Sequence, residues 1–439
     1  MTIALLVLGG IVGIGLGRYF FGGWFNHLSL YSAIWSGSLA LFEVRFVRYY
    51  SLAPETWLII IASWLSFVIG SATYMVVRGQ GIPQSGDRTG KIGPSERAVY
   101  VTIWILVGIA LAVALQHWSV VLKKFGSLEF VLLFGNVVYS TRVHEGLPGM
   151  IPFLDSLGLT ASLLAGIYTA MVGRVRVVSV LPLLVVIVQA LAAMGRAKIL
   201  LATLLFGSGF LLYRHRIRMN LRDSARASRA RLFIGMVSVA VLVVLGAELI
   251  RSTRVTVEEF AGATKALKNL EGGSFITPSI YLYLTVQHGV FNRYLMSEKE
   301  SVPIGTYSLA PFWRVLSKIG FETYVPQYQR FYSTPAPANT GTYLRELHAD
   351  YGIWGVVVGP YLLGLLCSFT WCRAVETGRL LYFSVLGHLY SLVGVSFLLL
   401  ATMWGYWVFS LLAGCVICFF LDRRESKRHT APQVLPVTC

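Results

Sequence analysis

Arginine is the residue type that most directly suggests chemistry in this 439-residue chain. A guanidinium group grips phosphate oxygens through two parallel hydrogen bonds, a geometry that lysine cannot offer. Several arginines fall in segments that we expect to lie outside the membrane, where basic residues are disfavoured. They are Arg142, Arg196, Arg251, Arg254, Arg293, Arg314, Arg330 and Arg345. The acids available to pair with them are Glu258, Glu259, Glu298 and Glu322. An anionic group such as a pyrophosphate would explain the excess of positive charge.

Arg196 is set apart by its place in the sequence. It stands in Met-Gly-Arg-Ala-Lys, between two apolar runs that leave almost no loop, so it should lie near the rim of a helix bundle. Ionisable residues held this close to a bilayer are candidates for function. The alternative is that Arg196, like Lys198, extends to the lipid phosphates.

The densest polar cluster is Asn-Thr-Gly-Thr-Tyr-Leu-Arg-Glu-Leu-His-Ala-Asp-Tyr-Gly, residues 339–352, which leads into an apolar run. Its candidate pocket residues are Asn339, Thr342, Arg345, His348 and Asp350. His348 could act as a general base, and Asp350 could do the same or orient an arginine. Equally, His348 could be an interfacial hydrogen-bonding residue and Asp350 a helix cap.

Aromatic side chains are frequent in residues 281–332. They include Tyr281, Tyr283, Tyr294, Tyr307, Trp313, Tyr324, Tyr328 and Tyr332. Such rings suit stacking on sugars, and we take Tyr281 as a candidate binding residue. They suit an interfacial aromatic belt equally well.

Other common chemistries lack support in the sequence. The expected outer segments hold no acidic pair with metal-ligand spacing, and there is no glycine-rich phosphate loop for ATP. The cysteines are Cys367, Cys372, Cys415, Cys418 and Cys439, and we interpret them as small apolar helix residues. We therefore expect neither a metal nor a cofactor. The net charge is +17, but the sequence contains no motif for recognising nucleic acid, and we expect no nucleic-acid partner.

These residues must be positioned by membrane helices. Hydrophobic residues make up 56% of the chain and charged residues 13%, against roughly 25% charged in soluble domains. At about 20 residues per span, the apolar runs predict about eleven transmembrane helices. They lie near 2–17, 28–47, 56–77, 99–116, 150–171, 177–194, 198–213, 232–250, 352–371, 380–400 and 403–421. Region 117–148 is expected to be an outer loop with a surface-lying helix around 127–139.

Basic residues set the orientation. Segment 214–231 holds seven arginines against one acid, and the tail from residue 422 and the short turn at Arg174 and Arg176 are also basic. With eleven spans all three fall on one side, which should be cytoplasmic. The N-terminus is then outside and the C-terminus inside.

One long loop, residues 251–351, then lies outside the membrane. Its aromatic content and helix-like spacing predict a folded cap over the bundle. The expected organisation is therefore helices one to eight in 1–250, the cap in 251–351, helices nine to eleven in 352–421 and a tail in 422–439.

In this pattern of spans the chain resembles the bacterial O-antigen polymerases, or Wzy-type oligosaccharide repeat-unit polymerases. Asn339-Thr340-Gly341-Thr342 leading to Asp350-Tyr351-Gly352 and Gly355 is similar to that family's segment of re-entry into the membrane. The family also has an arginine followed, after ten residues, by glycine in two outer loops. Arg196 with Gly207 and Arg330 with Gly341 fit that spacing.

The resemblance implies an all-helical bundle of the lipid-dependent glycosyltransferase type (GT-C-like) in the bacterial inner membrane. It implies a metal-independent transfer of a glycan from undecaprenyl diphosphate to a new lipid-linked repeat unit, in O-antigen or a similar surface polysaccharide. Arg196 and Arg330 would act in catalysis with His348 and Asp350, and other arginines would hold the diphosphate. The implied partners are the undecaprenyl-diphosphate-linked oligosaccharide, membrane lipid and a chain-length regulator protein.

Two other functions remain open. O-antigen ligases have a His-Asn pair at the re-entry segment, where this chain has Gly341 and Thr342, and this difference favours the polymerase. A flippase or other transporter would not need a hundred-residue outer cap. A proton-coupled carrier usually needs intramembrane carboxylates, and acids near the spans are few, essentially Glu43, Asp155 and Glu248.

Overall fold

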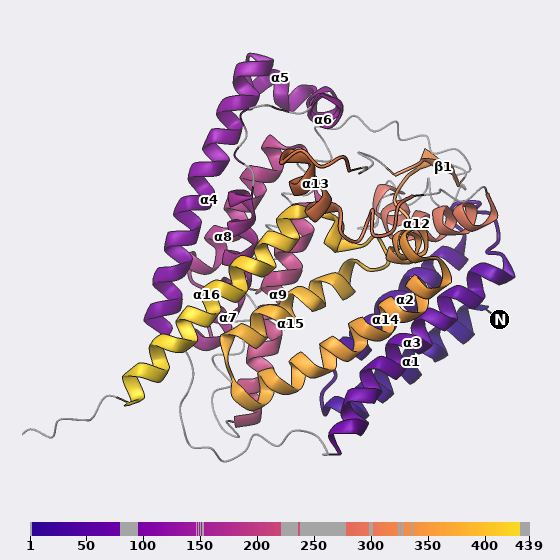
Figure 1. Cartoon of the computed structure of the whole chain (residues 1–439), viewed down its shortest axis with the longest axis horizontal. Helices are drawn as coiled ribbons and strands as arrows, with labels where there is room; N and C mark the ends of the chain where they lie inside the picture. The colour runs from indigo at the N-terminus through magenta and orange to yellow at the C-terminus, as the bar shows by residue number, and fades with distance from the viewer. Residues whose placement is uncertain are drawn as a thin grey trace, which may run out of the picture. The chain divides into compact units, whose positions relative to one another are not determined.

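The computed structural model describes residues 2–79, 95–145, 153–220, 278–297, 302–323, 329–334 and 337–430, and the single residues 147, 149, 151, 236, 237 and 325. These residues are predominantly α-helical (Figure 1). One two-stranded ladder interrupts them, where β1 (Tyr332–Ser333) pairs antiparallel with β2 (Pro337–Ala338).

The structure describes the following helices in chain order. They are α1 (Thr2–Phe21), α2 (His27–Val44), α3 (Pro54–Arg78), α4 (Glu96–Phe125), α5 (Leu128–Leu133), α6 (Gly135–His144), η1 (Leu154–Ser156), α7 (Leu157–Val172), α8 (Val177–Ala192), α9 (Ala197–Asn220), α12 (Pro278–Met296), α13 (Ala310–Lys318), α14 (Tyr343–Thr377), α15 (Leu380–Val395), η3 (Ala401–Met403) and α16 (Gly405–Thr430).

Seven helices of the described chain are long and apolar enough to cross a membrane. They are α1, α3, α4, η1 with α7, α9 up to Arg216, α14, and α16 up to Arg423. Helices α8 and α15 are apolar but shorter. The chain is therefore a helical membrane protein. Expected span 232–250 lies outside the described residues, and every other expected span coincides with a helix.

The chain divides into two compact units. Unit one comprises 1–82, 255–369 and 389–408, and unit two comprises 83–254, 370–388 and 409–439. Helices α12, α13 and the start of α14 belong to the same unit as α1–α3. The cap expected over residues 251–351 stays a prediction.

Small residues let the helices of unit one approach closely. Gly10, Gly13 and Gly17 of α1 face serines of α2, and a Cβ at Gly10 would lie 2.9 Å from the Cβ of Ser36. Helix α14 runs alongside α3 (Figure 1). There, a Cβ at Gly70 would clash with the carbonyl of Tyr361. Association through small residues is typical of membrane helices, which gain little from the hydrophobic effect in lipid.

Unit two is built in the same way around α7 and α9. A Cβ at Gly166 would clash with the carbonyl of Phe206, so these two backbones are in contact. Helix α4 continues to Phe125, beyond the expected span 99–116, and two short helices, α5 and α6, replace the single surface helix expected around 127–139. Val121, Val131 and Val138 pack there with Met194 of the α8–α9 turn.

Candidate functional site

The first turn of α14 contains a fully buried arginine. Arg345 is 1% exposed, and its Nη1 donates to the carbonyl oxygen of Asn339 at 2.5 Å. Its Nη2 donates to the carbonyl oxygen of Arg330 at 3.2 Å. The guanidinium therefore ties two consecutive stretches of the outer segment, at residues 330 and 339, to the start of α14.

Aromatic rings surround this arginine. The guanidinium carbon of Arg345 lies 5.1 Å from the ring centroid of Tyr332, and that of Arg330 lies 5.7 Å from the same ring. Tyr294 of α12 packs edge-on against Tyr332 and against His348. Its hydroxyl lies 3.0 Å from Nδ1 of His348. Arg330, Arg345 and His348 are thus gathered in one cluster.

Glu346 is a member of this cluster that the sequence did not single out. Its side chain is fully buried, and Gln329 donates a hydrogen bond to its Oε1. Its Oε2 has no hydrogen-bond partner in the described part of the chain. Burying a carboxyl group is costly unless it is hydrogen-bonded, and Gln329 supplies one such bond. The spacing of four residues from Thr342 and from Asp350 could have indicated a shared helix face.

Each glycine of segment 339–355 stands where a side chain would clash or would be strained. A Cβ at Gly341 would lie 2.5 Å from Cδ of Arg345, so this glycine leaves space for the arginine. Gly352 has φ 61° and breaks the helical geometry of α14, a conformation that L side chains rarely adopt. A Cβ at Gly355 would clash with the carbonyl of Leu347. The segment is therefore a compact structural unit that positions Arg345 and His348.

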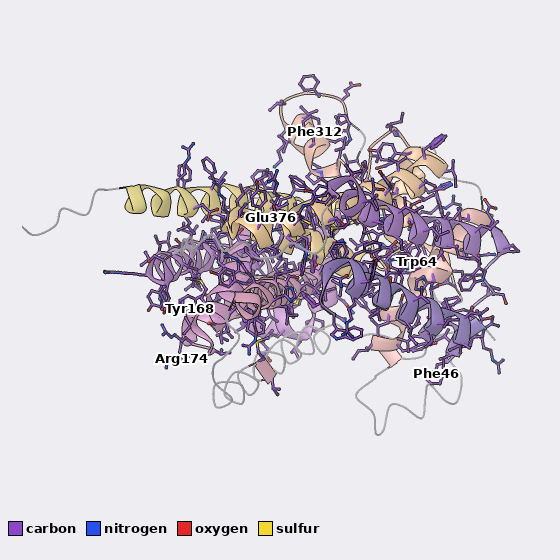
Figure 2. The ribbon with its side chains drawn as sticks, turned by 90° about the horizontal axis from the view of Figure 1, so that it is seen from below. Phe46, Trp64, Tyr168, Arg174, Phe312 and Glu376 are labelled. Atoms are coloured by element: carbon purple, nitrogen blue, oxygen red, sulfur yellow. The ribbon has the colours of Figure 1, made fainter. Side chains whose placement is uncertain are left out.

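Asp350 is occupied by backbone contacts. Its Oδ1 accepts from the Tyr307 N–H at 2.9 Å and its Oδ2 from the Ser308 N–H at 2.6 Å. The residue is 3% exposed, and both of its carboxyl oxygens accept backbone hydrogen bonds, so Asp350 positions this turn; its role as a base stays a prediction. It holds the turn before α13, from which Phe312 projects, 54% exposed (Figure 2).

Tyr281, Arg345 and Thr342 are buried. Tyr281 is 1% exposed, and its hydroxyl donates to the Leu41 carbonyl at 2.8 Å. Burial raises the pKa of this phenol, which stays neutral and fixes α12 to the end of α2. The guanidinium of Arg345 donates to carbonyl oxygens of the protein. Substrate binding by these three residues stays a prediction.

The accessible members of the predicted set are Arg293, Arg314, Arg330, Asn339 and His348. The first three are exposed and the last two half-buried. Among the described residues, the side chains of Arg293 and Arg330 form no hydrogen bond or ion pair. Their guanidinium groups contact only aromatic rings, Arg293 lying 5.1 Å from the ring centroid of Tyr50.

Arg142 and Arg196 belong to unit two. Nη2 of Arg142 lies 3.9 Å from where a Cβ of Gly195 would stand, so both arginines lie at the α8–α9 turn. Met194, two residues before Arg196, adopts φ 47°, a left-handed conformation that is unusual for a side chain of this size. Lys198 pairs with Asp155, which accounts for that acid near a span end. Arg251 and Arg254 lie outside the described residues.

No three His, Cys, Asp or Glu side chains of the described ranges gather as a metal-ligand set. The metal-independence of any reaction stays a prediction. Comparison with protein-family models, curated proteins and solved structures finds no match to this chain.

Proposed function

We propose that this protein is an extracytoplasmic glycosyltransferase of the inner membrane that polymerises undecaprenyl-diphosphate-linked oligosaccharide repeat units. The observation that carries the proposal is the cluster at the start of α14. A buried arginine there holds the main chain of Arg330 and Asn339, beside His348. The cluster stands at one end of a helix that is apolar enough to cross the membrane. An anionic lipid-linked donor would meet both features together.

In the proposed reaction, the acceptor sugar hydroxyl attacks the anomeric carbon of the donor glycan. The bond from that carbon to the diphosphate oxygen breaks, and undecaprenyl diphosphate leaves with the electron pair. Exposed arginines, Arg330 first among them, offset the charge that develops on the leaving group. Arg293 and Arg314 are further candidates for the diphosphate, and Arg196 and Arg142 of unit two are proposed to bind phosphate.

His348 is the proposed acceptor of the hydroxyl proton. If Nδ1–H of His348 donates to the Tyr294 oxygen, Nε2 is the basic nitrogen. Tyr294 would therefore select the tautomer, as a positioning residue. Asn339 is half-buried beside the cluster and could hydrogen-bond the sugar.

The alternatives are the ligase and the flippase. A ligase would transfer the glycan to a different acceptor. A flippase would move the lipid-linked unit across the membrane and break no covalent bond. The polymerase is favoured by the resemblance at residues 339–355, and α13 adds an exposed apolar surface suited to a polyprenyl chain. That surface includes Phe312, Val315 and Ile319.

The direct test is incubation of purified protein with lipid-diphosphate oligosaccharide in EDTA, without nucleotide. We expect a ladder of polymer. Arg330→Ala should lose about 30- to 1000-fold in rate, the equivalent of roughly 2–4 kcal/mol of transition-state stabilisation. Arg48→Ala removes an equally exposed arginine and should change little.

Cells separate the classes further. Arg330→Ala cells should accumulate single lipid-linked units on the outer face of the membrane. Units trapped on the cytoplasmic face would instead indicate a flippase. Transfer only to lipid A core, with no ladder, would indicate the ligase.

A further inference from the structure

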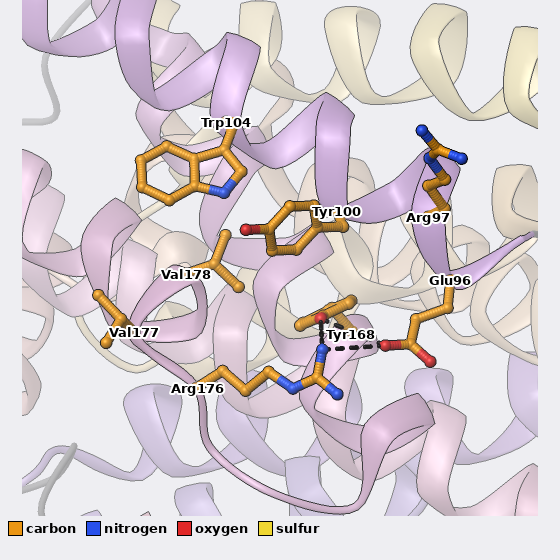
Figure 3. Close-up of a pocket in the computed structure, with 8 residues that line it drawn as sticks. All are labelled: Glu96, Arg97, Tyr100, Trp104, Tyr168, Arg176, Val177 and Val178. Atoms are coloured by element: carbon orange, nitrogen blue, oxygen red, sulfur yellow. Dashed lines mark hydrogen bonds and ion pairs between the residues drawn. The ribbon is translucent and has the colours of Figure 1, made fainter.

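Unit two holds a cavity of about 500 Å³ (Figure 3). It is formed by the first turns of α4 and α8 and the last turns of α7. The lining residues are Glu96, Arg97, Tyr100, Trp104, Tyr168, Arg176, Val177 and Val178. Helix α4 has 30 residues, which is about 45 Å at 1.5 Å per residue. The cavity and the arginines at the α8–α9 turn therefore belong to different faces of the membrane.

One side of the cavity is a pre-arranged polar triad. Nη1 of Arg176 donates to Oε1 of Glu96 at 3.1 Å and to the hydroxyl of Tyr168 at 2.5 Å (Figure 3). The guanidinium carbon also lies 5.6 Å from the Tyr168 ring centroid. Nε of Arg176 is buried without a hydrogen-bond partner among the described residues. The guanidinium is thus fixed in place with a donor still unused.

The other side holds an arginine without a partner. Within the described chain Arg97 forms no hydrogen bond or ion pair, and its side chain is exposed. Two arginines face one glutamate in this cavity, so one positive charge is uncompensated. An anion is the complementary ligand.

The rim of the cavity faces lipid. Tyr100 and Trp104 are 36% and 44% exposed and stand four residues apart on one face of α4. Val101 and Ile105 extend that exposed apolar surface along a helix long enough to cross the membrane. Amphipathic aromatic rings concentrate at the level of the lipid headgroups. The cavity therefore opens sideways, where a headgroup meets its acyl chains.

We propose that this cavity binds the phosphate headgroup of an anionic phospholipid of the surrounding membrane. The phosphate would accept from Arg97 and from the unused Nε–H of Arg176, and the acyl chains would lie over Trp104, Val177 and Val178. Tyr100 and Trp104 offer further donors to the glycerol and ester oxygens. The site is separate from the proposed catalytic cluster and does not depend on its chemistry.

The proposal is tested by native mass spectrometry of the full-length protein in detergent, titrated with phosphatidylglycerol. Arg97→Gln should weaken binding of the first lipid about fivefold, as expected for one arginine at a membrane surface. Trp104→Leu should weaken it as well. Phosphatidylcholine should bind more weakly than phosphatidylglycerol to the unmodified protein.

Arg174→Gln is the matched control, because Arg174 is exposed, lies two residues from Arg176 and does not line the cavity. Figure 2 shows it at the same end of unit two as Tyr168. The lipid affinity of the Arg174→Gln variant should match that of the unmodified protein. An equal loss in both arginine variants would show diffuse attraction and overturn the proposal. Displacement of the lipid by equimolar glycerol 3-phosphate would also overturn it, in favour of a soluble anion.

Discussion

At the scale of single residues, the structure separates arginines that hold the protein together from arginines that are available to a ligand. Arg345 is buried and donates to two carbonyl oxygens of the outer segment. Arg330, fifteen residues earlier, is exposed, and within the described part of the chain its guanidinium contacts only the Tyr332 ring. A lysine at position 345 would keep the charge but lose the fork that joins residues 330 and 339.

We therefore predict that Arg345→Lys lowers the melting temperature and the yield of polymer together. Arg345→Ala should cost about 3–5 kcal/mol of stability, because it leaves buried polar groups unpaired. Arg330→Lys should lower polymer yield and leave the melting temperature unchanged. Thermal melts in detergent alongside the ladder assay check both. A stable but inactive Arg345→Lys variant would contradict the positioning role and return this residue to the substrate.

His288 of α12 gives a pH prediction, since this helix lies outside the seven membrane helices. Burial lowers the pKa of His288 from 6.5 to about 3, and its Nε2 lies 3.0 Å from the Ser38 hydroxyl. Between these pH values the unfolded chain binds a proton that the folded chain does not. The resulting stability is complete above pH 6.5 and falls as the pH drops.

At pH 5, which is 1.5 units below 6.5, the folded protein has lost about 2 kcal/mol of stability through this histidine. His288→Gln keeps a group able to bond Ser38 but does not titrate, so its melting temperature should fall less between pH 7 and pH 5. Parallel melts of the two proteins measure the difference. Identical pH profiles would contradict this prediction, because they would mean that the pKa of His288 is the same in the folded and the unfolded protein.

At the scale of helices, the glycine contact between α3 and α14 predicts whether a glycine-to-alanine substitution raises or lowers the melting temperature. A Cβ at Gly70 would clash with the Tyr361 carbonyl, whereas a Cβ at Gly37 of α2 would meet nothing within 4 Å. Alanine favours a helix over glycine by about 1 kcal/mol. Gly37→Ala should therefore raise the melting temperature or leave it unchanged. Gly70→Ala should lower it, by the roughly 1–3 kcal/mol typical of overpacking. A Gly70→Ala protein as stable as the original would show that the α3–α14 contact adapts freely.

The positions of the helices could largely be predicted from apolar runs, because lipid requires long apolar segments. Their ends could not, since ends depend on packing. Helix α4 overruns its expected span and continues to Phe125 because Val121 is buried against α5, α6 and the α8–α9 turn. Helix α14 begins at Tyr343, but its helical geometry breaks at Gly352, which is where the expected span begins.

The polar density of segment 339–352 marked Arg345 and His348 as candidates, and the structure places them in one cluster with Arg330. The sequence does not show which of these side chains are buried. Burial decides what each side chain can do, and burial depends on distant segments. The backbone N–H groups of Tyr307 and Ser308 donate to the Asp350 carboxyl group. The Tyr281 hydroxyl donates to the Leu41 carbonyl. Glu346 was overlooked because its partner Gln329 is seventeen residues away.

At the scale of the whole molecule, the orientation in the membrane decides the compartment of any chemistry. The expected topology places α13 outside and the α7–α8 turn inside, on the evidence of basic residues in 214–231 and the tail. Ser317 of α13 and Arg174 of that turn are both exposed. Each can therefore carry a single cysteine on a background without the native cysteines.

We predict that a membrane-impermeant thiol reagent labels Ser317→Cys in intact spheroplasts and leaves Arg174→Cys unlabelled until the membrane is opened. The reason is electrostatic, since basic segments are retained on the cytoplasmic side during insertion. Labelling after detergent treatment shows that both cysteines can react. The reverse pattern in intact spheroplasts would turn the α14 cluster toward the cytoplasm. A periplasmic polymerase would then be untenable, whereas lipid binding at the cavity of unit two would persist in the opposite leaflet.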